Sequence, residues 1–544
     1  MHRLRGGRLA AWLVPIIFGG LATAFRLLSK ADLANDHYMT LGWAQQVLLG
    51  AWPERDFIEP GMPLSYLYSS LVQYYWPGPF SELAVTSAFV GAAAGVTVLC
   101  AARLSGSWLI GVFVALIELG FNPQLHSFHK VLTPVVTLAL LQAYGLVPSR
   151  RRLVWLGLWV AVSVLFRHDL GLYAALGALV GLVVQHWRQW RACGNALLWT
   201  AVGGLILMAP YGAYVQWASG WSEHVRRGAE FGKSEVHQLF TGIPGPAALF
   251  QADRSGAVAW LFFGAHLLLL IGLVVLIVRR RELESADAGA AAAAMTLLAL
   301  FLPVILREPI DGRLTDLAGV FALGLAWVLG EGTSRCGRLV RRGRHAAAAV
   351  TAVVLVIASF AAGTSVWALG RVDEQIDDAG LYAGIRGVRE TWEDLRDRGR
   401  VWPWARFWPT RELPQAVLYL RACTSPTDAV LLNWRAPEYN FFARRRFAAG
   451  HVEFLPPSSY TSDADQQWML DRLAHESVPV MLKNLDQQDE FEGAYPRVNA
   501  YLESRYNTVG TFTIYDGARI EIRVRRGLTA TRTWGPDEWP CGFE

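Results

Sequence analysis

Long apolar stretches separated by short polar loops dominate the first 370 residues of the chain. A membrane-spanning helix needs roughly 20 mostly apolar residues, and stretches of about that length recur through this region. Eleven such helices are expected, at residues 9–28, 82–102, 106–121, 131–147, 153–166, 170–186, 196–217, 256–278, 290–307, 315–332 and 346–369. The pattern therefore predicts a polytopic α-helical membrane protein with about 11 transmembrane helices.

The long apolar stretches end near residue 370, and charged residues of both signs then alternate with shorter apolar runs. Helical and strand-like patterns alternate in this tail, at 411–422, 429–433, 464–475, 478–482 and 495–504. The runs 511–515 and 520–524 flank Asp516-Gly517, a pair typical of a hairpin turn. We expect a transmembrane domain at 1–370, with its first outer loop at 29–81, and a C-terminal α/β domain at 371–544.

The composition agrees with this class of protein. Hydrophobic residues make up 53% of the chain and charged residues only 17%, whereas soluble globular proteins carry about 25% charged residues. The 23 Trp residues suit a protein with many membrane–water interfaces. A net charge of +5 over 544 residues is small and does not indicate nucleic-acid binding. The composition therefore excludes an ordinary soluble globular protein, and no nucleic-acid partner is expected.

Arginines gather in one set of alternate loops, which predicts the orientation because cytoplasmic loops carry an excess of Lys and Arg. These residues are Arg3, Arg5, Arg8, Arg150, Arg151, Arg152, Arg188, Arg191, Arg279, Arg280, Arg281, Arg335, Arg338, Arg341, Arg342 and Arg344. The first stretch lacks a convincing small-residue cleavage site, which favours a retained helix over a cleaved signal peptide. We expect a multi-pass protein of the inner (cytoplasmic) membrane, with a cytoplasmic N-terminus and a periplasmic or extracellular C-terminal domain.

The five Cys residues constrain little. Cys423 and Cys541 both lie in the tail, which is expected outside the cytoplasm, where disulfides persist. Their spacing leaves open whether they pair, because it does not give the distance between them. The sequence contains no Cys/His spacing typical of a metal site.

Ionisable residues are rare inside the apolar stretches and gather at the ends that are expected to face outward. Because a charge within the bilayer is costly, the depth of such residues indicates where function lies. An ion-coupled transporter is expected to place them nearer the midplane of the membrane. The distribution therefore favours chemistry at the outer membrane interface.

The first outer loop carries the most specific motif. It reads NDHY at 35–38, just after the first expected span, and RDFIEPGMPL at 55–64, between two expected interfacial helices. An Asp after the first span, an interfacial helix that ends in Gly50 and an acid before Pro resemble the GT-C glycosyltransferases. Within that superfamily, the motif most resembles the branch with the protein O-mannosyltransferases and the lipid A aminoarabinose transferase.

This resemblance implies paired carboxylates at Asp36 and at either Glu59 or Asp56. Asp36 is the candidate base, because a positioned carboxylate can accept the proton of an attacking hydroxyl, although an Asp at such a place also caps helices. Asp36 follows Asn and precedes His, so the Asp-Asp metal pair of the oligosaccharyltransferases is absent. No dedicated metal site or other cofactor is expected, and a weakly bound divalent cation at the carboxylates is left open.

A lipid phosphate that leaves during transfer needs cations in a water-poor site. The candidates for this role are Lys130, Arg167, Arg307 and Arg313. Each has a local alternative: Arg167 can pair with Asp169, Lys130 can extend its ammonium into the headgroups, and the two others can pair with acids at 308–316. The sequence does not decide between these interpretations.

The first hypothesis is an inverting glycosyltransferase of the GT-C type. It would move a sugar from a polyprenyl-phosphate donor to a lipid, glycan or protein acceptor at the outer face of the membrane. One alternative is a transporter or flippase of a lipid-linked sugar, and another is a non-catalytic membrane scaffold whose tail binds a partner. The identity of the sugar and of the acceptor does not follow from the sequence.

Overall fold

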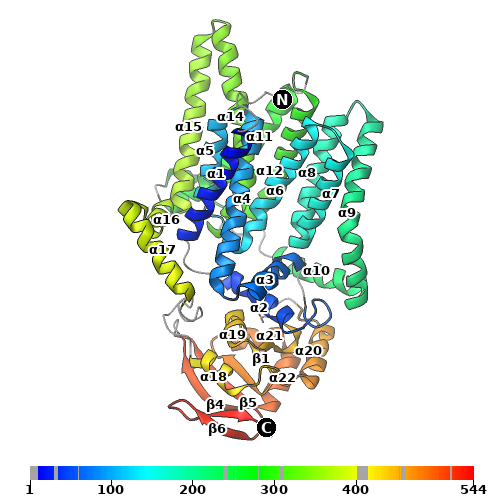
Figure 1. Ribbon diagram of the computed structural model, residues 1–544, viewed down its shortest axis with the longest axis vertical. Helices are drawn as coiled ribbons and strands as arrows, with labels where there is room; N and C mark the ends of the chain where they lie inside the picture. The colour runs from blue at the N-terminus through cyan, green and yellow to red at the C-terminus, as the bar shows by residue number, and fades with distance from the viewer. Residues whose placement is uncertain are drawn as a thin grey trace. The chain divides into compact units, whose positions relative to one another are not determined.

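The computed structural model describes residues 10–29, 35–58, 61–236, 243–251, 253–279, 281–306, 311–400, 415–451, 454, 460–514 and 517–544. The chain divides into two compact units, and Figure 1 labels their elements. The membrane unit comprises Met1–Lys30, Leu83–Tyr211 and Gln238–Asp394. The loop–tail unit comprises Ala31–Glu82, Gly212–His237 and Leu395–Glu544. The first outer loop thus belongs to the same compact unit as the tail.

The membrane unit is built from helices, of which the one that begins at Pro79 and those that end at Ala218 and Arg400 continue into the loop–tail unit. They are α1 (Ala10–Leu28), α4 (Pro79–Ser105), α5 (Trp108–Gly120), η1 (Leu125–Ser127), α6 (Phe128–Leu146), α7 (Arg150–Phe166), α8 (His168–His186), α9 (Trp190–Ala218), η2 (Pro246–Phe250), α11 (Arg254–Arg279), α12 (Ser285–Leu306), α13 (Asp311–Leu314), η3 (Thr315–Leu317), α14 (Ala318–Arg341), α15 (His345–Leu369), α16 (Val372–Asp378), η4 (Leu381–Ala383) and α17 (Gly384–Arg400). Each of the eleven expected stretches overlaps one of these helices.

Seven helical segments among the described residues are long and apolar enough to cross a membrane, and shorter apolar helices accompany them. The seven are Pro79–Ser105, His168–His186, Trp190–Ala218, Arg254–Arg279, Ser285–Ile305, Thr315–Arg341 and His345–Leu369. The shorter ones include Trp12–Leu28 and Trp108–Gly120. The protein is therefore a mostly helical, multi-pass integral membrane protein.

The inner helices of the membrane unit pack through small residues. Helix α8 lies along α12, and a Cβ atom added at Gly289 would lie 2.7 Å from the carbonyl oxygen of Gly181. Side chains at both positions would push the helices apart, which is why small residues are common at helix contacts in membranes. Most of the apolar length of α12 and α14 is buried in this way.

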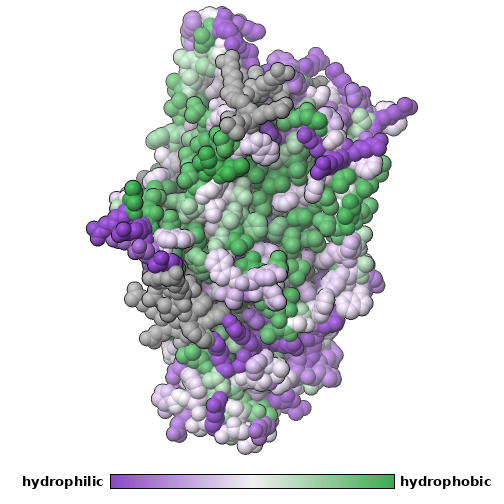
Figure 2. Space-filling model, viewed as in Figure 1, coloured by the Kyte–Doolittle hydropathy of each residue, from purple (hydrophilic) through white to green (hydrophobic). Residues whose placement is uncertain are grey.

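Other helices of the membrane unit leave their apolar side chains uncovered. Helices α9 and α15 bury little of their most apolar segments, and Val353, Ile357 and Phe360 of α15 are exposed. Figure 2 shows the hydrophobic surface that the helices of this unit present on one face. Because water would penalise such a surface, lipid is the solvent that fits it.

The loop–tail unit combines helices with two β-sheets. Its helices are α2 (Asn35–Leu48), α3 (Pro63–Tyr75), α10 (Trp221–Val236), α18 (Gln415–Cys423), α19 (Pro437–Ala443), η5 (Ala448–Gly450), α20 (Asp463–His475), α21 (Gln488–Ala494) and α22 (Pro496–Arg505). Its strands are β1 (Ala429–Leu432), β2 (Arg446–Phe447), β3 (Val480–Asn484), β4 (Tyr506–Thr513), β5 (Arg519–Arg525), β6 (Ala530–Trp534) and β7 (Trp539–Phe543).

The larger sheet has the order β2-β1-β3-β5-β4, and β6 pairs with β7 in a separate hairpin. Strands β2, β1 and β3 run parallel, whereas β5 pairs antiparallel with both β3 and β4. All residues of β1 and β3 are buried, as expected for central strands covered on both faces. The predicted hairpin is present, with Phe512 opposite Ile520, while Asp516 lies outside the described residues.

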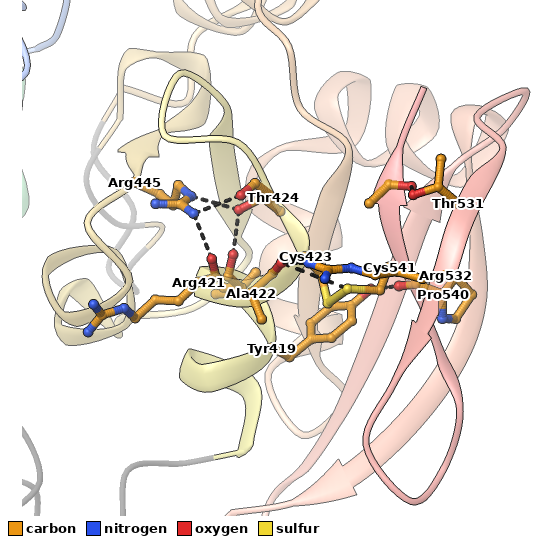
Figure 3. The surroundings of a disulfide bond; sticks show 12 residues. Tyr419, Arg421, Ala422, Cys423, Thr424, Arg445, Thr531, Arg532, Pro540 and Cys541 are labelled. Carbon is orange, nitrogen blue, oxygen red and sulfur yellow. Dashed lines mark hydrogen bonds between the residues drawn. A yellow bond between two sulfur atoms is a disulfide. The ribbon is translucent and has the colours of Figure 1, made fainter.

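A disulfide ties the smaller sheet to the rest of the tail. Cys423 at the end of α18 bonds to Cys541 in β7, with Cα atoms 4.5 Å apart, so the pairing that the sequence left open is formed (Figure 3). The Arg445 guanidinium donates to the carbonyl oxygens of Arg421 (3.0 Å) and Thr424 (2.7 Å). These bonds satisfy acceptors that the end of α18 leaves unpaired and place a cation at its negative pole.

The first outer loop packs directly on the tail within the loop–tail unit. The Ile58 amide donates to the Gly450 carbonyl at 2.9 Å, and the Ile58 side chain joins the buried core of the tail. Phe57 packs against Phe447 with ring centres 5.7 Å apart. The Gln46 amide group bonds to the backbone of residues 445 and 447. Loop and tail therefore share one core, and the conformation of the loop depends on the tail.

Candidate functional site

The short segment after α2 forms a tight turn around Asp56. Its carboxylate accepts hydrogen bonds from the Trp52 amide (2.7 Å) and from the Arg55 guanidinium (3.0 and 2.6 Å). Burial raises the pKa of Asp56, but the hydrogen bonds from Arg55 and the Trp52 amide, together with the charges of nearby arginines, outweigh burial and leave the pKa lowered. Asp56 is thus engaged in holding the turn. Glu59, the other candidate for the second acid, lies outside the described residues.

Asp36 lies in the first turn of α2 and forms an ion pair with Arg435 of the tail. The side chains are 47% and 28% exposed, respectively, so solvent reaches the pair from one side. Arg435 follows the carboxyl end of β1, where open α/β sheets commonly place their ligand-binding loops. Arg435 was not among the predicted site residues, and its place two residues after the expected strand 429–433 was the available signal in the sequence.

Aromatic packing holds the two partners in place. Tyr38 of α2 contacts Phe441 and Phe442 of α19, with ring centres 6.3 and 5.4 Å apart. On another side of α2, Trp43 packs against Tyr66 of α3 at 5.8 Å. Because both ends of the ion pair belong to packed elements, the Asp36 carboxylate has a defined position in the unit.

A second carboxylate is buried near Asp36. Glu82 accepts hydrogen bonds from Tyr68 (2.8 Å) and Ser69 (2.7 Å), and its Oε1 lies 3.5 Å from Nε2 of His37. His37 follows Asp36 in the same helical turn, so Glu82 fixes the side chain beside the candidate base. Both are almost fully buried, which indicates a positioning role rather than direct contact with a substrate.

The four candidate cations belong to the membrane unit, whereas the candidate carboxylates belong to the loop–tail unit. Lys130 pairs with Asp316 at 2.6 Å, and Arg167 binds Asp169 through two hydrogen bonds of 2.7 and 2.6 Å. Arg167 is the single extended residue between α7 and α8. Arg313 lies half-buried in α13, and Arg307 lies outside the described residues. The local ion pair considered for Arg167 therefore exists, whereas the pairing of Lys130 with Asp316 was not foreseen. A phosphate would have to bind alongside or displace these carboxylates.

Within the part of the chain that the structure describes, no three His, Cys, Asp or Glu residues cluster as metal ligands would. Asp36 and Asp56 each engage an arginine. A guanidinium beside a carboxylate opposes the binding of a cation there. These two residues therefore do not form a prearranged cation site.

An ion pair between Arg226 and a buried carboxylate of the tail holds the segment around α10 in place. Arg226 donates to both carboxylate oxygens of Asp465, which is 1% exposed, and also binds Glu223 and Glu230. On the other side of α10, buried Glu54 accepts from Ser219 (3.0 Å) and lies 2.7 Å from Nδ1 of His224. The two sets of contacts hold residues 219–230 against both the first loop and the tail.

Asp465→Asn is expected to lower the free energy of unfolding of the loop–tail unit by about 1–3 kcal/mol, because hydrogen bonds to a charged group are lost. Burial raises the pKa of Asp465, but the hydrogen bonds from Arg226 and Ser462, together with the charges of Arg226 and Arg227, outweigh burial and leave the pKa lowered. Because the pKa of Asp465 is lower in the folded protein than its ordinary value of 3.8, the ionised carboxylate stabilises the fold at pH values above 3.8. This stabilisation is lost as the pH falls through the lower pKa of the folded protein. Hydrogen exchange of α20 at several pH values measures both effects.

The difference in the free energy of unfolding between wild type and Asp465→Asn is therefore expected to stay constant from pH 8 to about pH 5. It should decrease only in stronger acid. Asp489→Asn is the control, since Asp489 is an exposed acid of the same unit. Equal protection of α20 in wild type and Asp465→Asn at neutral pH would contradict the prediction.

Comparison with known proteins identifies the fold of the chain. No protein-family model matches the chain, and no curated protein matches it in sequence. The archaeal oligosaccharyltransferase AglB from Archaeoglobus fulgidus, in complex with an inhibitory peptide and a dolichol-phosphate, matches in structure. The match covers 94% of this chain and 74% of AglB, with a TM-score of 0.50 and 11% identity. ArnT from Cupriavidus metallidurans bound to undecaprenyl phosphate matches over 95% of this chain and 99% of its own, with a TM-score of 0.48 and 14% identity.

At this level of identity, the likeness to AglB establishes the fold and not the activity. The GT-C-like fold predicted from the first outer loop is confirmed. The mixed β/α region predicted for the tail is also present.

Proposed function

We propose that this protein is an inverting glycosyltransferase that uses a polyprenyl-phosphate sugar as its donor. The observation that carries the proposal is a GT-C-like fold along nearly the whole chain, in which a half-exposed carboxylate, Asp36, opens the first outer loop. AglB in the matching structure is in complex with a dolichol-phosphate. The acceptor would be a lipid, a glycan or a protein, and transfer would take place at the extracytoplasmic face of the inner membrane.

The chemistry is a single displacement at the anomeric carbon. The Asp36 carboxylate takes the proton of the acceptor hydroxyl, whose oxygen forms a bond to the anomeric carbon. The bond from that carbon to the phosphate oxygen breaks, and polyprenyl phosphate leaves as an anion. Either Glu59 or Asp56 would help to position the reactants. Arg and Lys side chains stabilise the leaving charge, a role that we assign to Lys130, Arg167, Arg307 and Arg313.

Binding of undecaprenyl phosphate tests this proposal without knowledge of the sugar, because the lipid phosphate is the expected product in every case. We expect native mass spectrometry of the purified protein to show a preference for undecaprenyl phosphate over undecaprenol. Arg167→Ala should weaken binding about 10- to 100-fold, since a charge-assisted contact of about 1.5–3 kcal/mol is lost.

Arg188→Ala is the matched control, because Arg188 lies in a loop that is predicted to face the cytoplasm. Equal binding of the phosphate and the alcohol would overturn the donor class. Selective binding without transfer from any polyprenyl-phosphate sugar would instead favour a flippase for such lipids.

A further inference from the structure

Arg435 stands on a rigid part of the tail. Asn433, at the end of β1, exchanges two hydrogen bonds with Asn484 of β3, of 3.3 and 2.6 Å. Trp434 is buried and packs against Tyr439 of α19 with ring centres 5.5 Å apart. The backbone on both sides of Arg435 is therefore fixed by the sheet and by α19.

The Arg435–Asp36 pair is poorly suited to a purely stabilising role. Both side chains are partly exposed, and exposed ion pairs contribute only about 0–1 kcal/mol to stability. The surrounding aromatic packing already holds α2 against α19 without the pair. A guanidinium is well suited to orienting the carboxylate beside it, because its planar array of donors matches carboxylate geometry.

We infer that Arg435 is a positioning residue for Asp36, so that the C-terminal tail contributes to the catalytic site through this side chain. The catalytic role of Asp36 in this inference rests on the proposed function. The effect of Arg435 on the ionisation of Asp36 can be measured without assuming that function. A fixed, ionised carboxylate is ready to accept a proton from a bound hydroxyl. The tail would then be required for catalysis as well as for folding.

Other groups near α2 must be kept apart from this effect. Besides tyrosines, the titratable or charged side chains on α2 and the elements packed against it include His37, Glu82, Glu438 and Arg446. Glu82 and Glu438 sit on different peptides from Asp36 after digestion with a suitable protease. A measurement that reads each carboxyl group separately therefore distinguishes their titration from that of Asp36.

The test is the pH dependence of carbodiimide labelling, which requires the protonated carboxyl group, followed by peptide mass spectrometry of the full-length protein in nanodiscs. Without its cation, Asp36 should become labelled at higher pH, by about one to three units in Arg435→Gln. Arg435→Lys keeps the charge and should restore most of the wild-type midpoint. Labelling of Asp489, an exposed acid of the tail, should stay unchanged in all variants, which controls for the reactivity of the reagent, and hydrogen exchange of β1 and β3 reports that the tail is still folded.

An Asp36 midpoint that is the same in wild type and Arg435→Gln, with Asp489 unchanged, would overturn the inference. Where a transferable donor has been found, the acid limb of the pH–rate profile should move by the same amount, and kcat should fall about 10- to 100-fold from misplacement of the carboxylate. Arg519 is an exposed arginine of β5, and Arg519→Gln should change neither the pH–rate profile nor kcat. If wild type fails to bind undecaprenyl phosphate, the proposed function fails, while a shifted Asp36 midpoint would still confirm the coupling.

Discussion

Replacing Asp36 by Asn is expected to lower the rate of sugar transfer by about 10²- to 10⁴-fold, the usual contribution of a general base. The amide cannot take the proton of the acceptor hydroxyl, so the attacking oxygen would have to carry it into the transition state. Folding should survive, because the ion pair that is lost is partly exposed and contributes about 0–1 kcal/mol. Binding of undecaprenyl phosphate should also survive, because Asp36 repels an anion rather than holding it.

The measurement is a single-turnover assay in nanodiscs, with the polyprenyl-phosphate sugar that the wild type consumes in a screen of such donors. Asp489→Asn is the matched control, since it makes the same chemical change at an exposed position of the tail. A transfer rate within a few fold of wild type in Asp36→Asn would remove Asp36 from the mechanism. Loss of both lipid binding and thermal stability would show that the residue is structural.

The positions of the membrane helices could be predicted because the physics that sets them is local. Each span must supply its own backbone hydrogen bonds and its own apolar surface, so a window of the sequence contains the information. The same holds for the hairpin of β4 and β5, whose turn and alternation lie within 20 residues. The hairpin of β6 and β7 was missed because most of β6 is exposed and polar and shows no alternation.

The candidate site could be predicted only in part, because its contacts join distant residues. Asp36 was found from a motif in its own loop, whereas its partner lies almost 400 positions later in the chain. Asp56 was found as an acid, but its engagement with Arg55 and the Trp52 amide depends on the backbone conformation of the turn. The buried contacts of Glu82 likewise involve residues of both α2 and α3, and the sequence pattern of neither helix predicts them.

Removal of the disulfide is expected to lower the stability of the tail by about 2–5 kcal/mol. Cys423 and Cys541 are 118 positions apart, and a cross-link that closes a loop of about this length restricts the unfolded chain by up to about 5 kcal/mol in the chain-entropy model. Two hydrogen bonds also join this hairpin to α18: Arg532 donates to the Ala422 carbonyl, and Tyr419 donates to the Pro540 carbonyl. The hairpin should therefore stay packed against α18, with lower stability. Hydrogen exchange of α18 and β7 in the Cys423→Ser/Cys541→Ser variant measures the loss.

Cys193→Ser is the matched control, since Cys193 is a free thiol in α9 of the membrane unit. Alkylation of the denatured, unreduced wild type should label Cys100, Cys193 and Cys336 only, and labelling of all five cysteines would contradict the disulfide itself. Because α18 packs against α19, and Arg435 lies just before α19, the double variant should also shift the Asp36 labelling midpoint toward that of Arg435→Gln. Lower tail protection with an unchanged midpoint would show that α19 holds Arg435 without help from the cross-link.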